Sequence, residues 1–125
     1  MTENEISNLV IGAAMTVHSS LGPGLLESSY EECLFYELKL KGLLAERQKA
    51  LPLVYKEIKM DAGYRVDLIV ENKVILEIKA VIEVNEIFFA QVLTYLKLSG
   101  CKLGLLLNFN VKSMKDGIKR IVYHF

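Results

Sequence analysis

The chain has 125 residues, of which 52% are hydrophobic and 24% charged, and its 15 basic and 15 acidic side chains give zero net charge. This length suffices for one domain with a sizeable core, and the neutral balance argues against a protein that coats nucleic acid non-specifically. No apolar run approaches the ~20 residues of a membrane span, and the acidic start lacks the basic segment of a signal peptide. Cys33 and Cys101 have no metal-ligand spacing, so we expect reduced, buried thiols in a cytoplasmic protein.

Two amphipathic helices are predicted in the first third of the chain. Apolar side chains recur at helical spacing over residues 3–20 and again, after a glycine- and proline-rich break, from Leu25 to Gly42, where the glycine suits a C-terminal cap. Glu27 lies in the first turn of the second helix, where its charge complements the helix dipole. Glu31 and Glu32 are expected on the solvated surface of that helix.

The middle of the chain is predicted to form strands. Residues 46–60 alternate weakly between apolar and polar side chains, which indicates one strand and the start of another, and Pro52 makes the first an edge or bulged strand. Residues 64–79 form two runs rich in β-branched side chains around a polar turn, which predicts a β-hairpin. A two-residue loop would split the hairpin's charges between the two faces, whereas a three-residue loop places Asp67 opposite Glu77.

The apolar pattern selects the three-residue loop. With that loop, six apolar side chains share one face of the hairpin, and a slip of one residue would mix the two faces. These side chains are Val66, Leu68, Val70, Val74, Leu76 and Ile78. On the other face, Asp67 and Glu77 converge with Lys79, which is two residues from Glu77 and so about 7 Å from it along the strand.

Two facing carboxylates in a half-buried site repel each other and tend to share a proton unless a cation lies with them. Oxygen ligands of this kind suit Mg²⁺ or Mn²⁺. A lysine beside them can orient or deprotonate a metal-polarised water, or meet charge that develops on a phosphate. The alternative is an ordinary cross-strand pair of a lysine and a carboxylate on a solvated face, which contributes only ~0.2–1 kcal/mol.

A third helix is predicted from Glu86 to Ser99, with Asn85 as its N-terminal cap. Gln91 and Tyr95 are four residues apart on this helix, so they share one face. On the sequence pattern alone, this pair is equally consistent with a polar seam in a packed helix.

The last part of the chain is predicted to return to the sheet. Residues 102–109 form a near-continuous apolar run, typical of a strand covered on both faces, and residues 118–125 alternate enough for a final strand. The order of strand, helix and strand favours a parallel, right-handed crossover between residues 74–79 and residues 102–109. We therefore expect an α/β fold, with a mixed central sheet flanked by helices.

Three motifs in this chain resemble those of a known family. The segment Gly24–Tyr30 is similar to the motif of the GxxExxY proteins. Asp67, Glu77 and Lys79 match the D…ExK core of the PD-(D/E)XK nuclease superfamily, to which that family belongs. The segment Gln91–Tyr95 resembles the QxxxY helix motif of exonuclease-like branches of the same superfamily. The resemblance covers nearly the whole chain, from Ile11 to Val122, with the three motifs in the expected order. One departure is Val66, which occupies the position of the proline in the PD-(D/E)XK motif.

The resemblance implies a role for each of these residues. Asp67 and Glu77 would bind the divalent metal, Mg²⁺ or Mn²⁺, with the backbone carbonyl of Ile78 as a further ligand. Glu27 would bind a metal-bound water or a second ion. Lys79 would position or activate the attacking water.

The helix motif has a supporting role in this comparison. Gln91 and Tyr95 would contact the phosphate, or would hold the lysine and the groups around the metal in place.

The fold and function implied are those of a nuclease. The expected structure is a single PD-(D/E)XK nuclease-like domain over residues 1–125, with a restriction-endonuclease-like core, which hydrolyses phosphodiester bonds of DNA in repair or defence. One alternative is a catalytically inactive domain that binds a nucleic acid or a protein, and another is a structural or oligomerisation module. Retention of all four charged site residues favours the nuclease. We also expect a homodimer, because so small a domain covers little of a duplex.

Overall fold

A computed structural model of the chain describes residues 1–61 and 63–125. The elements in chain order are α1 (Glu3–Leu21), α2 (Glu27–Leu40), β1 (Ala45–Tyr55), β2 (Ile58–Val70), β3 (Val74–Lys79), α3 (Glu86–Ser99), β4 (Leu103–Asn108), a 3-10 turn (Met114–Gly117) and β5 (Ile118–Val122). The positions predicted for the helices and strands are confirmed to within a few residues.

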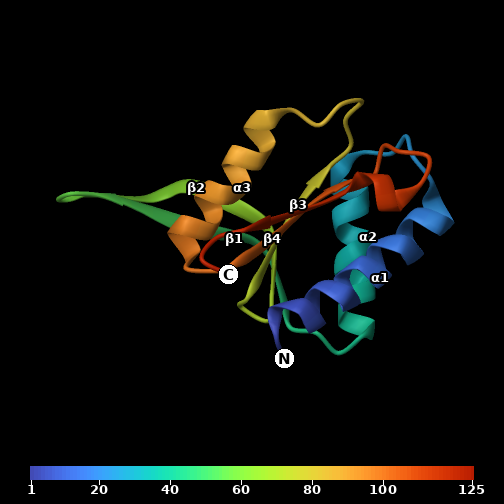
Figure 1. The fold of residues 1–125 in the computed structure, drawn as a ribbon, viewed down its shortest axis with the longest axis horizontal. Helices are drawn as coiled ribbons and strands as arrows, with labels where there is room; N and C mark the ends of the chain where they lie inside the picture. Colours follow the sequence, from blue (N-terminus) through green and yellow to red (C-terminus); the bar gives the residue numbers. More distant parts are fainter.

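The five strands form one mixed sheet in the order β1-β2-β3-β4-β5. All neighbours are antiparallel except β3 and β4, which run parallel and are joined through α3, as the sequence predicted. Helices α1 and α2 cover one face of the sheet and α3 covers the other (Figure 1). Every residue of β4 is buried, so the expectation of a strand covered on both faces is confirmed. The chain therefore has the predicted α/β architecture, consistent with a restriction-endonuclease-like fold.

Local hydrogen bonds fix where the helices begin and end. Thr2 and Glu5 form a capping box at the start of α1, and the Asn85 side chain accepts from the Ile87 amide at the start of α3. Helix α2 ends in a Schellman motif, in which the amide of Leu43 donates to the carbonyl of Leu38 and Gly42 has φ 78. The glycine predicted as a cap thus occupies the left-handed position that ends the helix.

The hairpin turn has the predicted length. Val70 pairs with Val74, which leaves residues 71–73 as the loop, and the Lys73 amide donates to the Val70 carbonyl at 3.0 Å. Glu71 and Asn72 both have left-handed backbones, with φ of 53 and 54. The turn therefore sets the register that places Asp67 opposite Glu77.

One residue of the apolar face was predicted on the wrong side. Val66 is fully buried, but it packs with Ile69 and Leu96 on the face covered by α3, whereas Leu68 and the other predicted members pack under α1 and α2. The regular pairing of β2 with β3 stops at Leu68, and beyond it the amide of Asp67 donates to a side chain. Strict alternation along β2 therefore fails between Val66 and Leu68, where the pairing with β3 ends while the register with β1 continues.

Strand β1 lies at one edge of the sheet, and its register with β2 shifts between Leu51 and Leu53. Pro52 sits at that shift, so the prediction of an edge strand with a bulge is confirmed. Beyond it, the far halves of β1 and β2 extend from the body of the molecule as a two-stranded arm (Figure 1).

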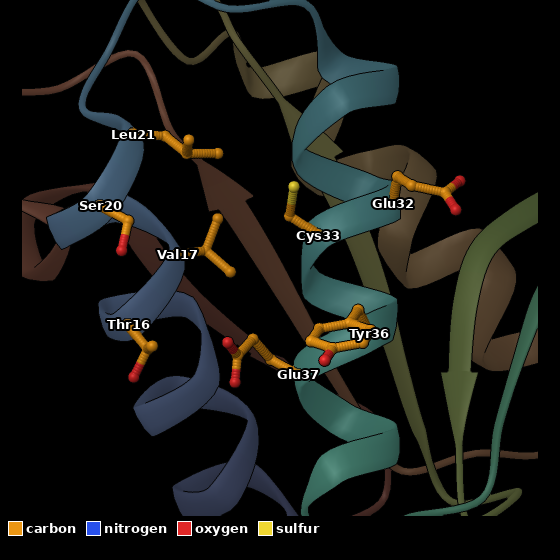
Figure 2. A pocket seen from close by; sticks show the side chains of 8 residues that line it. All are labelled: Thr16, Val17, Ser20, Leu21, Glu32, Cys33, Tyr36 and Glu37. Atoms are coloured by element: carbon orange, nitrogen blue, oxygen red, sulfur yellow. The ribbon is translucent and has the colours of Figure 1, made fainter.

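Helices α1 and α2 leave a hollow of about 380 Å³ between them on the outer side of the molecule. Figure 2 shows Val17 and Leu21 on α1 opposite Cys33 on α2. Cys33 was predicted to be buried, but it is partly exposed because it lines this hollow, whereas Cys101 is buried and both thiols are free. Within the described part of the chain, no α-helix has the length and hydropathy needed to cross a membrane.

Candidate active site

Asp67 and Glu77 face each other where the β2–β3 ladder ends. The amide of Asp67 donates to Glu77 Oε1 at 3.1 Å, and the amide of Ile78 donates to Asp67 Oδ2 at 2.8 Å. Each carboxylate therefore accepts a hydrogen bond from a main-chain amide of the opposite strand. The predicted juxtaposition of the two carboxylates follows directly from the three-residue turn.

Glu77 lies in a place that disfavours a negative charge. Its side chain is buried, with only 7% of the residue exposed. Burial, followed by repulsion from Asp67, raises the pKa of Glu77 to about 8, although the amide of Asp67 and the charge of Lys79 oppose the rise. At neutral pH the metal-free pair therefore holds a proton. This is the electrostatic state expected of two carboxylates that lack a neighbouring cation of sufficient charge.

Lys79 is half-buried beside this pair, on the same face of β3 as Glu77. Its Nζ lies 4.4 Å from the centre of the Phe88 ring, in the first turn of α3. Such a contact holds an ammonium by attraction to the ring face without neutralising its charge. Phe88 was not predicted as a site residue, although it shares a helix face with Gln91 and Tyr95, three and seven residues further on.

Gln91 and Tyr95 lie on the same face of α3, as predicted. Burial first, and then the charges of Glu77 and Asp67, raise the pKa of the Tyr95 hydroxyl. Gln91 lies one turn away and is exposed. Together with Tyr64 on β2, these two side chains line a hollow of about 200 Å³, called the tyrosine hollow below.

Glu27 approaches the same end of β3 from another element. It lies in the first turn of α2, is exposed, and its Oε2 accepts from the amide of Ala80 at 3.3 Å. Ala80 follows Lys79 directly, so Glu27 lies at the end of β3 that carries Lys79. Within residues 1–61 and 63–125, however, no three acidic, histidine or cysteine side chains converge closely enough to hold one metal ion.

Tyr30 explains how the segment Gly24–Tyr30 positions Glu27. Its hydroxyl donates to the carbonyl of Gly22 at 2.6 Å and accepts from the amide of Leu25 at 3.1 Å. Its fully buried ring stacks on Phe109 with 4.6 Å between the ring centres. The tyrosine therefore ties the loop between α1 and α2 to the core, and this loop sets where α2 begins.

We expect Tyr30→Phe to lower the free energy of unfolding by about 1–3 kcal/mol, because two hydrogen bonds to the loop are lost in a buried place. The ring stacking on Phe109 would remain. Chemical denaturation monitored by circular dichroism measures the change. Tyr36→Phe is the matched control, since Tyr36 lies on the same helix but is 62% exposed. Equal effects of the two substitutions would contradict a positioning role for the Tyr30 hydroxyl.

Glu31 was predicted on the solvated surface, and that prediction is wrong. Only 7% of Glu31 is exposed, and Oε2 lies 3.0 Å from Arg47 Nη2 in a salt bridge between α2 and β1. Glu32 is exposed as predicted, and it pairs with the same arginine. Glu31 is four residues beyond Glu27, which puts it on the face of α2 that looks toward the sheet, and Arg47 provides the charge that makes its burial tolerable.

Gln48 links Glu31 to the site, and this residue was not predicted. Its amide Nε2 donates to Glu31 Oε1 at 2.8 Å and to Asp67 Oδ1 at 3.3 Å. Gln48 has φ 50, a left-handed backbone within a strand. No local sequence pattern predicts a left-handed residue at this position of the strand. The only related signal is that Glu31, the partner of Gln48, lies one helical turn after Glu27. The chain of contacts from Arg47 through Glu31 and Gln48 orients the carboxylate of Asp67.

Asn108 was also missed, and it fixes the segment that follows Lys79. This residue is 2% exposed and lies at the end of β4, paired with Lys79. Its side-chain amide donates to the carbonyl of Val81 at 3.0 Å, while Oδ1 accepts from the Val81 amide at 3.1 Å. These bonds hold the chain in place as it leaves β3 toward α3.

The groups at the site fit a divalent cation with oxygen ligands. Asp67 and Glu77 present hard carboxylate oxygens, and burial, followed by repulsion from Asp67, raises the pKa of Glu77. The carbonyl of Ile78 points to the same strand edge as its amide, which already meets Asp67. A third carboxylate is not required, because Mg²⁺ keeps several waters when it binds proteins.

Comparison with known proteins gives one result that covers nearly the whole chain. The model of the PD-(D/E)XK nuclease superfamily matches residues 4–121. The narrower GxxExxY grouping rests on the segment Gly24–Tyr30 alone. Neither the curated proteins nor the solved structures compared with the chain gave a match. The family match and the facing carboxylates agree, and the chain belongs to the PD-(D/E)XK nuclease superfamily.

Proposed function

We propose that the protein is a metal-dependent phosphodiester hydrolase that cuts DNA. Membership of the superfamily supports a nuclease-type function, with nucleic acid as the substrate. The observation that carries the proposal is the pair Asp67 and Glu77, held face to face with Lys79 beside them. A pair of unneutralised carboxylates in a buried place destabilises the metal-free fold, which a purely structural role would not require.

In this proposal Asp67, Glu77 and the carbonyl of Ile78 would hold Mg²⁺ or Mn²⁺, and Glu27 would act through a metal-bound water or a second ion. When bound, the cation supplies Lewis-acid polarisation of a phosphate oxygen and lowers the pKa of a coordinated water. Glu77 must first release the proton that its raised pKa retains. Because one proton leaves as the cation binds, metal affinity should increase with pH up to about 8.

The other residues act on the attacking water and the phosphate. The ammonium of Lys79, held over Phe88, would position that water and meet the charge that develops on the phosphate oxygens. The hydroxyl of Tyr95 would contact the phosphate or the lysine, and Gln91 would assist from the next turn. Gln48 keeps Asp67 in its orientation through the hydrogen bond at 3.3 Å.

The first experiment is calorimetric titration of Mg²⁺ and Mn²⁺ into the wild type and an Asp67→Ala/Glu77→Ala variant. We expect binding to the wild type alone, with proton release at pH 7 detected by comparing buffers of different ionisation enthalpy. A parallel assay on labelled single- and double-stranded DNA should show metal-dependent cleavage. Absence of metal binding would reject the hydrolase and leave a nuclease-shaped module that binds a nucleic acid or a protein.

The proposal also includes the cellular compartment, the biological role and the oligomeric state of the protein. Two free cysteines suit a reducing compartment such as the cytoplasm, and a role in repair or defence is consistent with a small DNA-cutting domain. A homodimer would bring a second site and lengthen the footprint on a duplex. Sedimentation at several protein concentrations, with and without DNA, measures that association.

A further inference from the structure

The tyrosine hollow includes Gln91 and Tyr95, which the chemistry proposed above uses, but its other walls have no part in that chemistry. It measures about 200 Å³, and its walls come from β2 and from one face of α3. The lining residues are Tyr64, Ile87, Ala90, Gln91, Thr94 and Tyr95. None of these six side chains is charged, so the hollow is unsuited to a phosphate and suited to a neutral, partly apolar group.

Tyr95 connects the hollow to the site. Its side chain forms a wall of the hollow, and burial, followed by the charges of Glu77 and Asp67, raises the pKa of its hydroxyl. Tyr64 precedes Asp67 by three residues on β2, and the two tyrosine rings lie 6.4 Å apart at 60°. A phosphate bound at the carboxylates would therefore have the rest of its nucleotide next to this hollow.

The chemistry of the walls matches a nucleobase. The rings of Tyr64 and Tyr95 and the side chain of Ile87 offer stacking and apolar contact, which every base accepts through its flat face. The exposed amide of Gln91 carries both donors and an acceptor, as the edge of a base requires. The volume is below the roughly 300–1,000 Å³ of sites that enclose drug-sized ligands, so it suits one planar ring system rather than a whole nucleotide.

We propose that the tyrosine hollow binds the nucleobase of a nucleotide adjacent to the phosphate at the carboxylate site, by stacking on Tyr64. This inference rests on the proposed function and narrows its substrate. A base within an intact duplex is stacked on its neighbours and cannot enter the hollow unless it is first extruded. The preferred substrate is therefore single-stranded DNA or a frayed end.

The test measures binding without cleavage, in an Asp67→Asn background. This substitution removes a metal ligand and one repulsive charge, and the new side chain can still accept from the Ile78 amide. A short fluorescent single-stranded oligonucleotide is titrated by anisotropy with this protein and with three further variants in the same background. These are Tyr64→Leu, Tyr64→Phe and, as a matched control on the opposite side of the sheet, Tyr36→Leu. Each is also titrated with oligonucleotides in which a single base is absent, at successive positions.

We expect Tyr64→Leu to raise Kd by about 5- to 150-fold, the range for loss of one stacked base. Tyr64→Phe should retain the affinity, because the ring remains, and Tyr36→Leu should have no effect. At one position, the missing base should weaken binding strongly when Tyr64 is present and very little after Tyr64→Leu. This non-additivity is the signature of direct contact between that base and the ring.

Two results would overturn the base site. One is an unchanged Kd after Tyr64→Leu. The other is that, at every position, the loss of binding free energy caused by Tyr64→Leu and that caused by the missing base simply add. Cleavage by the wild type in Mg²⁺ is measured separately, so the two proposals can fail independently. Binding that depends on Tyr64 in a protein that cuts no DNA would support the base site and reject the nuclease. Metal-dependent cutting that is indifferent to Tyr64 would do the reverse.

Discussion

Glu77→Gln is expected to stabilise the metal-free protein increasingly as the pH rises from 5 to 9, and to abolish metal-dependent cleavage. Burial and Asp67 raise the pKa of Glu77 from 4.5 to about 8. Between those values the unfolded chain has lost this proton and the folded chain retains it, so the stability of the wild type falls as the pH rises. The amide variant carries no such penalty. The unfolding free energy of Glu77→Gln should exceed that of the wild type by an amount that levels off above pH 8, at about 5 kcal/mol at most.

Urea unfolding with a chelator present, repeated at several pH values, measures this difference. Glu83→Gln is the matched control, because Glu83 is an exposed acid in the segment between β3 and α3. Its curve should run parallel to that of the wild type. A Glu77→Gln curve that also ran parallel would mean that Asp67 and Glu77 do not repel in the folded state. Saturating Mg²⁺ should reduce the advantage of Glu77→Gln, since the cation compensates the two charges in the wild type alone.

Lys79→Met is expected to reduce kcat for DNA cleavage by about 10²- to 10³-fold, the range for loss of one group that stabilises charge in a transition state. Methionine keeps an unbranched side chain against Phe88 but removes the ammonium, which lies 4.4 Å from the ring centre in the wild type. Metal affinity should not decrease, because Asp67 and Glu77 remain. Single-turnover cleavage, combined with calorimetric titration of Mg²⁺, separates the two quantities.

Lys73→Met is the control for this prediction. Lys73 lies in the turn of the same hairpin, is exposed, and its Nζ donates to the carbonyl of Met1 at 2.5 Å. Removing that charge should leave both cleavage and metal affinity near their wild-type values. If the two lysine variants lost cleavage equally, the ammonium of Lys79 would contribute only to the general positive potential around DNA. Loss of metal binding in Lys79→Met would instead indicate a structural defect at β3.

The hairpin was predictable because its two faces differ so strongly. Val70, Val74 and Leu76 are apolar and fall on one side only if the turn has three residues, and that same choice brings Asp67 to Glu77. The ends of α2 and α3 were predictable for a similar local reason, since Gly42 and Asn85 act within a few residues of themselves. Patterns with a short period were therefore sufficient for most of the fold.

The support for Asp67 was not predictable, because it depends on contacts between distant parts of the chain. Nothing near Glu31 indicates that Arg47 will compensate its charge, so a helical glutamate is most simply placed in solvent. Gln48 reaches Asp67 from a strand position with a left-handed backbone, which the pattern of a strand does not encode. Val66 was misplaced because the alternation on which its prediction relied fails where the pairing of β2 with β3 ends.

The place of β3 in the sheet has a consequence for synthesis in the cell. This strand carries Glu77 and Lys79, yet it lies between β2 and β4, and β4 is made only after the whole of α3. The charged residues of the site are therefore all synthesised before β4, the buried strand that pairs with β3. Since a domain of this kind folds as a unit, we expect the nascent chain to remain without a formed site until its last strands emerge.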